Sequence, residues 1–143
     1  MTIRKWLYED NLPISKIESN SFIDPWSLQM ISDTFMLDNF YGIVCEENGE
    51  VVGYLAITYC LEEAEINIIA VREEYRRRGI SYNLLQTAIK NLKEMKVEKL
   101  FLEVRRSNES AQALYEKCGF KYVGVRPNYY NGKEDALLMS LIL

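Results

Sequence analysis

The sequence predicts one α/β domain spanning residues 1–143, built on a central twisted mixed sheet with helices on both faces. Size and composition support this, because 143 residues with 48% hydrophobic and 27% charged residues suit one ordinary globular core. The hydrophobic pattern also alternates along the chain between runs of period two and stripes at helical spacing. Finally, no internal repeat or linker-like tract divides the chain.

The amino-terminal part is predicted to form one strand and two helices. Ile3–Tyr8 has the two-residue alternation that is typical of a strand. Asp10 is a candidate N-cap for a first helix that ends near Phe22. A second helix follows, with Ser27 or Asp24 as its candidate cap.

Three consecutive strands are expected to form an antiparallel meander. Tyr41–Cys45 and Val51–Cys60 are β-rich and flank Asn48-Gly49, which is a strong signal for a hairpin. A turn at Glu62-Glu63 leads into a third strand that ends at Val71.

The remaining chain is expected to alternate helices and strands. After Gly79, apolar residues at helical spacing predict a helix that stops near Lys96. Lys99–Val104 has the pattern of a short buried strand, and the strand–helix–strand unit should place its two strands side by side. Phe120–Val125 and Ala136–Leu143 are predicted to be the closing strands.

One more helix lies between these strands. Ser107 or Asn108 is expected to open it, and Gly119 to end it as a C-cap.

A basic turn, Arg76–Gly79, joins the strand Ile66–Val71 to the next helix. A helix N-terminus carries unpaired N–H groups and a partial positive charge, and arginines bind phosphate oxygens in bidentate fashion. Glycine lets the backbone approach a ligand closely. These features predict a phosphate cradle. By composition alone, the same run is also typical of a solvated corner or of a patch that contacts nucleic acid.

Overall charge and composition narrow the classes of partner. With 17 basic and 21 acidic residues the net charge is −4, which argues against nucleic acid as the main partner and is compatible with a cationic substrate. No apolar run is long enough for a bilayer, and Met1–Trp6 lacks a signal-peptide core, so we expect no membrane partner. Cys45, Cys60 and Cys118 show neither metal-ligand nor paired spacing, which predicts reduced thiols and a cytoplasmic location.

The chain contains no histidine. This excludes Ser-His and Cys-His nucleophilic machinery as well as a His-rich metal site. A general base in this protein must therefore be Glu, Asp, Tyr, Lys, Cys or a water chain.

The spacing Arg76-x-x-Gly79-x-Ser81 resembles the Arg/Gln-x-x-Gly-x-Gly/Ala signature of the GNAT acetyltransferase superfamily. Ser81 departs from the Gly or Ala that the family prefers there, but serine is small enough to fit. Most of the chain is similar to one branch, the bacterial ribosomal-protein alanine N-acetyltransferases. The further matching pieces are Ile17-Glu18, Pro25-Trp26-Ser27, Asn67–Val71, Leu102–Arg105, Ser107-Asn108, Ala113–Glu116, Gly119-Phe120, Asn128–Tyr130 and Glu134–Ala136.

This resemblance implies acetyl-CoA as cosubstrate and no metal. It places the pantetheine arm beside the backbone of a strand end and the pyrophosphate at the basic turn. The residues implied to bind the cosubstrate are Ile69, Ala70, Val71, Arg76, Arg77, Arg78, Gly79, Ile80, Ser81, Tyr82 and Asn108.

The resemblance also implies the acid–base groups and the acceptor. Glu103 stands at the position of the family's general base and Tyr115 at that of its general acid. Tyr129 and Tyr130 fall in a predicted loop, Pro127–Lys133, that covers the peptide in related N-terminal acetyltransferases. The implied partner is a protein N-terminus, that of a small-subunit ribosomal protein beginning with Ala.

Pattern alone gives each of these residues a structural interpretation. Glu103 is then a surface carboxylate on a strand, Tyr115 a core aromatic, Asn108 a helix cap, and Trp26 a core residue or one wall of a substrate groove. Two other functions stay open at this point. One is acetylation of a small-molecule amine or a lysine side chain, and the other is a non-catalytic module that binds coenzyme A.

Overall fold

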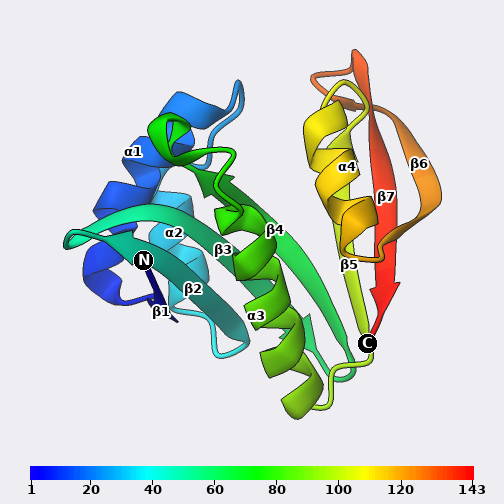
Figure 1. The fold of residues 1–143 in the computed structure, drawn as a ribbon. Coiled ribbons are helices and arrows are strands. Elements are labelled where there is room, and N and C mark those ends of the chain that lie inside the picture. The colour runs from blue at the N-terminus through cyan, green and yellow to red at the C-terminus, as the bar shows by residue number, and fades with distance from the viewer.

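The computed structural model describes residues 1–143 and forms a seven-stranded mixed sheet in the order β1-β2-β3-β4-β5-β7-β6, flanked by helices (Figure 1). The strands are β1 (Thr2–Lys5), β2 (Phe40–Glu47), β3 (Glu50–Cys60), β4 (Glu63–Val71), β5 (Lys99–Arg105), β6 (Lys121–Tyr130) and β7 (Glu134–Ile142). The helices are α1 (Asn11–Ser21), α2 (Leu28–Phe35), α3 (Ile80–Glu94) and α4 (Glu109–Lys117), with 3-10 turns at Tyr8–Asp10 and Glu73–Tyr75. None of the helices has the length and apolar content needed to cross a membrane.

The predicted antiparallel meander is confirmed. β2 pairs with β3 and β3 with β4, both antiparallel, and β1 adds to the outer edge of β2. Asn48 and Gly49 form the β2–β3 turn with φ values of 53° and 79°. Both angles lie in the left-handed region that Asn and Gly tolerate, which is why this dipeptide specifies the hairpin.

The strands β4 and β5 are parallel neighbours, but they pair over only one end. The register runs from Glu63 opposite Lys99 to Glu65 opposite Phe101. Beyond these residues the two strands diverge, as Figure 1 shows, and a gap opens in the middle of the sheet. On β4 the divergence begins at a bulge, because Ile66 and Ile68 pair with consecutive residues of β3 and Asn67 is left over.

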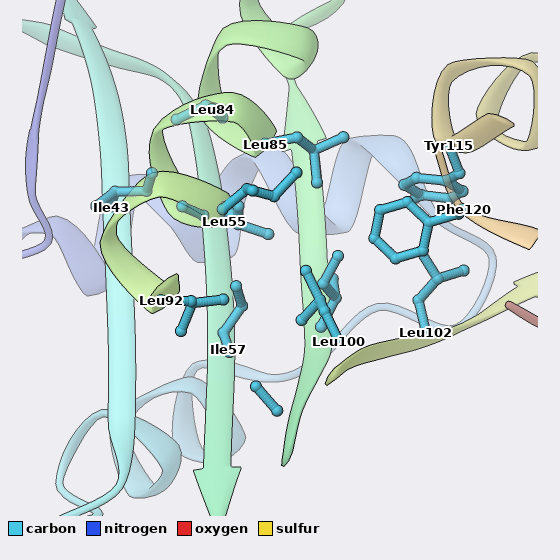
Figure 2. Close-up of a cluster of buried hydrophobic side chains, with 14 of the residues drawn as sticks. Ile43, Leu55, Ile57, Leu84, Leu85, Leu92, Leu100, Leu102, Tyr115 and Phe120 are labelled. Atoms are coloured by element: carbon cyan, nitrogen blue, oxygen red, sulfur yellow. The ribbon is translucent and has the colours of Figure 1, made fainter. Parts of the chain in front are cut away.

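The larger hydrophobic core lies between the sheet and the helices α3 and α4. Leu84 and Leu85 of α3 pack with Leu55, Ile57 and Leu100 of the sheet, and all five side chains are fully buried (Figure 2). This is the apolar stripe that the helical spacing after Gly79 predicts.

A second core covers the opposite face of the sheet, under α1 and α2. Trp6 and Tyr54 pack there edge to face, with ring centroids 6.0 Å apart, together with the helix residues Ile14 and Ile31. The predicted sandwich with helices on both faces is therefore confirmed.

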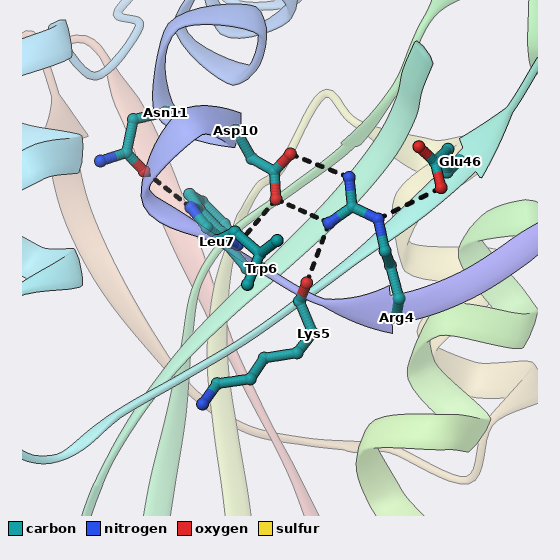
Figure 3. Close-up of polar contacts among 7 residues, drawn as sticks. All are labelled: Arg4, Lys5, Trp6, Leu7, Asp10, Asn11 and Glu46. Carbon is teal, nitrogen blue, oxygen red and sulfur yellow. Dashed lines mark hydrogen bonds and ion pairs between the residues drawn. The ribbon is translucent and has the colours of Figure 1, made fainter. Parts of the chain in front are cut away.

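The amino-terminal prediction was wrong in two details. β1 ends at Lys5 rather than Tyr8, because Tyr8–Asp10 forms a 3-10 turn. Asp10 precedes α1 but makes no side-chain cap there, since its carboxylate accepts from the Leu7 N–H at 2.7 Å and binds Arg4 at 2.8 and 3.0 Å (Figure 3). Ser27 does cap α2, where its hydroxyl accepts from the Met30 N–H at 3.1 Å.

The predicted boundary between the strand at Phe120–Val125 and the loop at Pro127–Lys133 was also wrong. β6 runs to Tyr130, so Tyr129 and Tyr130 belong to the strand, and only residues 131–133 form the turn. The pairing with β7 is interrupted after Arg126 and resumes at Tyr130, so three residues of β6 stand opposite one residue of β7. Pro127 and Asn128 suggest a loop because they break the ladder, but pairing beyond them restores the strand.

Candidate active site

A cavity of about 240 Å³ fills the gap between the diverging strands β4 and β5. Its walls come from α1, the α1–α2 connection, β4, β5, α4 and the end of β6. The predicted site residues that line it are Trp26, Ile69, Glu103, Asn108, Tyr115 and Tyr130. A larger cavity of about 890 Å³ lies between α1 and the segment after β4, and its lining includes Arg76 but neither Glu103 nor Tyr115.

Glu103 and Tyr115 enter this cavity from opposite faces of the sheet. The alternation on β5 buries Leu102 and Val104 in the core beneath α3 and α4, so Glu103 points to the other face. Tyr115 comes from α4 and belongs to that core, with 6% of its surface exposed. The two side chains line one cavity only because the sheet is open at this point.

Tyr115, the predicted acid, is held in place by aromatic packing and lines the cavity. Its ring packs edge to face on Phe120, with centroids 5.7 Å apart. Burial, with smaller effects of Tyr130 and Cys118, raises the pKa of Tyr115 well above its ordinary value. The phenol therefore keeps its proton at neutral pH.

Arg126 was missed from the sequence, yet it contacts the predicted base. Its Nη2 lies 2.9 Å from Oε1 of Glu103, whose side chain is 19% exposed. No local sequence pattern marks this contact, because Arg126 reaches Glu103 only through the strand order β5-β7-β6.

A second arginine, Arg105, joins the α1–α2 connection, which borders the cavity, to the start of β7. Its guanidinium binds Asp24 of the α1–α2 connection and Glu134 of β7, each at 2.9 Å. Asn131 donates to the same Asp24 carboxylate at 3.0 Å, and the Arg105 guanidinium lies 4.1 Å from the centroid of the Tyr130 ring. We call Asp24, Arg105, Asn131 and Glu134 the clasp.

Glu18 is the buried acidic residue of this cavity, and its role was not predicted. One carboxylate oxygen accepts from the Tyr54 hydroxyl at 2.6 Å, and the other from the Trp26 N–H at 3.0 Å. Burial raises the pKa of Glu18, while these two hydrogen bonds oppose the rise. Trp26 both packs against the second core and lines the cavity, so it fits both interpretations of its role.

The start of α3 has the features expected of an anion cradle. Gly79 precedes the helix with φ 78° and provides no side-chain cap. The backbone N–H groups of residues 77–82 donate no hydrogen bond within the protein. A Cβ added at Gly79 would meet no atom within 4 Å, so the approach to these donors is open.

The three arginines of the turn do not converge on one site. Arg76 donates to the Val71 carbonyl at 3.0 Å and approaches the Ser21 hydroxyl at 3.4 Å, so it is turned toward α1. The Arg78 guanidinium lies 5.0 Å from the centroid of the Tyr75 ring, and Arg77 is exposed. The feature that this turn shares is its set of backbone N–H groups without partners, not a common direction of its arginine side chains.

Of the other residues predicted to bind the cosubstrate, Ile69 and Asn108 line the cavity, whereas the side chains of Ala70, Val71 and Ile80 are buried in the two cores. Beyond Glu65, β4 has no strand partner on its β5 side, so the backbone around Ile69 is free to pair with an amide-containing ligand. Asn108 caps α4, where its side-chain oxygen accepts from the Ala111 N–H at 3.2 Å, and it also lines the cavity.

Comparison with known proteins agrees with this architecture. Residues 7–120 match the model of the acetyltransferase (GNAT) family, so the chain belongs to the GNAT family of N-acetyltransferases.

Individual relatives place it near one branch of that family. The [ribosomal protein bS18]-alanine N-acetyltransferase of Escherichia coli is 35% identical over 128 residues, covering 87% of this chain and 86% of that protein. The crystal structure of the ribosomal-protein-S18-alanine N-acetyltransferase from Escherichia coli superposes with a TM-score of 0.93 at 33% identity, covering 99% of this chain and 92% of the other. Ard1 from Thermoplasma volcanium gives 0.92 at 30% identity, covering 99% and 97%. The resemblance to the ribosomal-protein alanine branch is confirmed.

Proposed function

We propose that this enzyme transfers the acetyl group of acetyl-CoA to the N-terminal α-amine of a protein, namely a small-subunit ribosomal protein that begins with Ala. The observation that carries the proposal is the meeting of Glu103 and Tyr115 in one cavity from opposite faces of the opened sheet. The names of the relatives support this acceptor.

Each substrate approaches the gap from a different face of the sheet. The cosubstrate lies on the α3 side, with its pyrophosphate on the free amides before α3 and its amide-containing arm along the unpaired edge of β4. The acceptor enters from the Glu103 side, beneath the clasp, between Trp26 and Tyr130. The acetyl carbon is then presented in the gap between the base and the acid.

A carboxylate base activates an N-terminal α-amine more readily than it activates the side-chain amine of a lysine acceptor. With a pKa near 8, about one α-amine in ten is neutral at pH 7, against about one lysine amine in 2,500. Glu103, directly or through water, removes the extra proton of the ammonium form, and the neutral nitrogen then attacks the thioester carbon. The second proton, which the nitrogen loses as the amide forms, leaves by the same base or water path.

The tetrahedral oxyanion and the leaving thiolate each need a donor. A backbone N–H on the unpaired edge of β4, near Val71, supplies the first. The protonated Tyr115 hydroxyl supplies a proton to the sulphur, so coenzyme A leaves as the thiol. No histidine is required, in agreement with the sequence.

Competition between acceptors tests the proposal. Thiol release from acetyl-CoA is measured with an Ala-starting peptide, with the same peptide blocked at its N-terminus but carrying a lysine, with a polyamine and with free lysine. We expect turnover with the free N-terminus and little with the others. Turnover only with small amines or lysine side chains would contradict the acceptor and favour the alternative acetyltransferase function.

A further inference from the structure

Arg126 contacts the base from outside the reaction cavity. Its guanidinium pairs with Oε1 of Glu103 at 2.9 Å, while Oε2 makes no ion pair or hydrogen bond within the protein. Arg126 lines a separate cavity of about 450 Å³ on the sheet face opposite α4, and Glu103 lines both cavities. The arginine therefore holds one oxygen of the carboxylate and leaves the other free for an acceptor.

The position of Arg126 depends in turn on the β6–β7 hairpin. Its guanidinium carbon lies 4.9 Å from the centroid of the Tyr129 ring, and that ring packs edge to face on Tyr130 at 5.1 Å. Tyr129 belongs to the three residues of β6 that stand opposite one residue of β7. This irregular segment therefore places an aromatic ring against Arg126.

A second carboxylate adds negative charge to this outer cavity. Glu65 of β4 lines the same outer cavity as Glu103 and Arg126. Burial and the charge of Glu103 raise the pKa of Glu65, and Arg126 opposes this rise. Without Arg126, the two carboxylates would repel each other, and Glu103 would be free to turn away.

We propose that Arg126 is a positioning residue for the base. It fixes the Glu103 carboxylate so that one oxygen faces the acceptor amine, and through Tyr129 it couples that orientation to the β6–β7 hairpin. The proposal rests on the proposed role of Glu103. A planar guanidinium suits this task because its fork of donors has a fixed geometry, which the single ammonium of lysine lacks.

A double-mutant cycle tests the proposal. Steady-state acetylation of an Ala-starting peptide is compared in the wild type, Arg126→Gln, Glu103→Gln and the double variant, with Arg126→Lys beside them. We expect Arg126→Gln to lower kcat about 10- to 100-fold with the KM for acetyl-CoA unchanged, since a misdirected catalytic group costs on this order. Arg126→Lys should recover part of the loss. In the Glu103→Gln background, Arg126→Gln should have no further effect, because its partner is already gone.

A matched control separates positioning from general stability. Arg106 follows β5 and binds Asp135 of the β6–β7 hairpin at 3.2 Å, but it does not contact Glu103. Arg106→Gln should therefore leave kcat unchanged. If Arg126→Gln does not fold, as judged by thermal unfolding, Arg126→Lys takes its place in the cycle.

The outcomes distinguish this proposal from the proposed function. A kcat within about twofold of the wild type in Arg126→Gln, or an equal loss in the Glu103→Gln background, would overturn the positioning role. Wild-type turnover of Glu103→Gln would overturn the role of the base itself, and the positioning role with it.

Discussion

The Glu18 carboxylate accepts a hydrogen bond of 2.6 Å from the Tyr54 hydroxyl, and this buried pair joins α1 to the centre of β3. The second oxygen of Glu18 accepts from the backbone N–H of Trp26, so one side chain fixes the cavity wall that we assign to the acceptor. A buried carboxylate is costly unless it is hydrogen-bonded, and here both oxygens are.

Replacing Glu18 with Gln should harm acceptor binding more than cosubstrate binding. Glutamine has one acceptor oxygen, and its NH₂ group only donates, so either the Tyr54 hydroxyl or the Trp26 N–H loses its acceptor at a cost of about 1–3 kcal/mol. We expect a higher KM for the peptide and an unchanged KM for acetyl-CoA, measured by steady-state kinetics. Equal changes in both constants would contradict a local role.

The same residue predicts a pH dependence of stability. Because burial raises the pKa of Glu18, the folded state keeps the proton to higher pH than the unfolded chain. The contribution of Glu18 to stability is therefore complete below about pH 4.3, the ordinary value for Glu, and is lost as pH rises through the folded pKa. Denaturant unfolding of the wild type and Glu18→Gln at several pH values should show the wild type losing stability relative to the variant as pH rises. A constant difference would contradict the raised pKa.

The clasp predicts a separate effect on the acceptor. Arg105→Gln leaves Asp24 and Glu134 without their shared cation, and the α1–α2 connection is no longer tied to β7. We expect the peptide KM to rise about tenfold, equivalent to about 1.4 kcal/mol, with little change in acetyl-CoA binding. Arg106→Gln, which removes the neighbouring exposed pair with Asp135, is the control and should behave as wild type. If both variants bind the peptide normally, the clasp does not shape the acceptor site.

Gly79→Ala should weaken the binding of acetyl-CoA. An alanine at φ 78° is strained by about 1–2 kcal/mol, although space for its Cβ is open, so the turn will relax and the free amides will move. Gly49→Ala offers a matched control, because Gly49 also has an open Cβ position and a φ of 79° but lies in the β2–β3 turn. Both variants should lose similar stability in thermal unfolding. Only Gly79→Ala should raise the KM for acetyl-CoA, and an equal rise in Gly49→Ala would contradict the cradle.

Local signals predicted much of this fold correctly. Asn48-Gly49 specifies the hairpin by its tolerance of positive φ, Ser27 caps α2 through its own hydroxyl, and the stripe after Gly79 packs on the sheet as its spacing requires. Each of these features depends on residues within a few positions of one another. The alternation that turns Glu103 away from the core of α3 and α4 is of the same kind.

Features that depend on distant pairing could not be predicted in this way. Asp10 is a local exception, because Arg4 and the Leu7 N–H, six and three positions away, take the carboxylate that would cap the helix. The clasp joins Asp24 to Asn131, which are separated by 107 positions, and Arg126 reaches Glu103 only because β6 and β7 add to β5 in that order. Nothing in the local sequence marks these partners.

The most direct test of the central claim is the single-turnover rate of Glu103→Gln and Tyr115→Phe, measured with an Ala-starting peptide and saturating acetyl-CoA. Acid–base roles predict that each variant binds acetyl-CoA as the wild type does but transfers the acetyl group about 10²–10⁴-fold more slowly. Wild-type rates in both variants would contradict these roles.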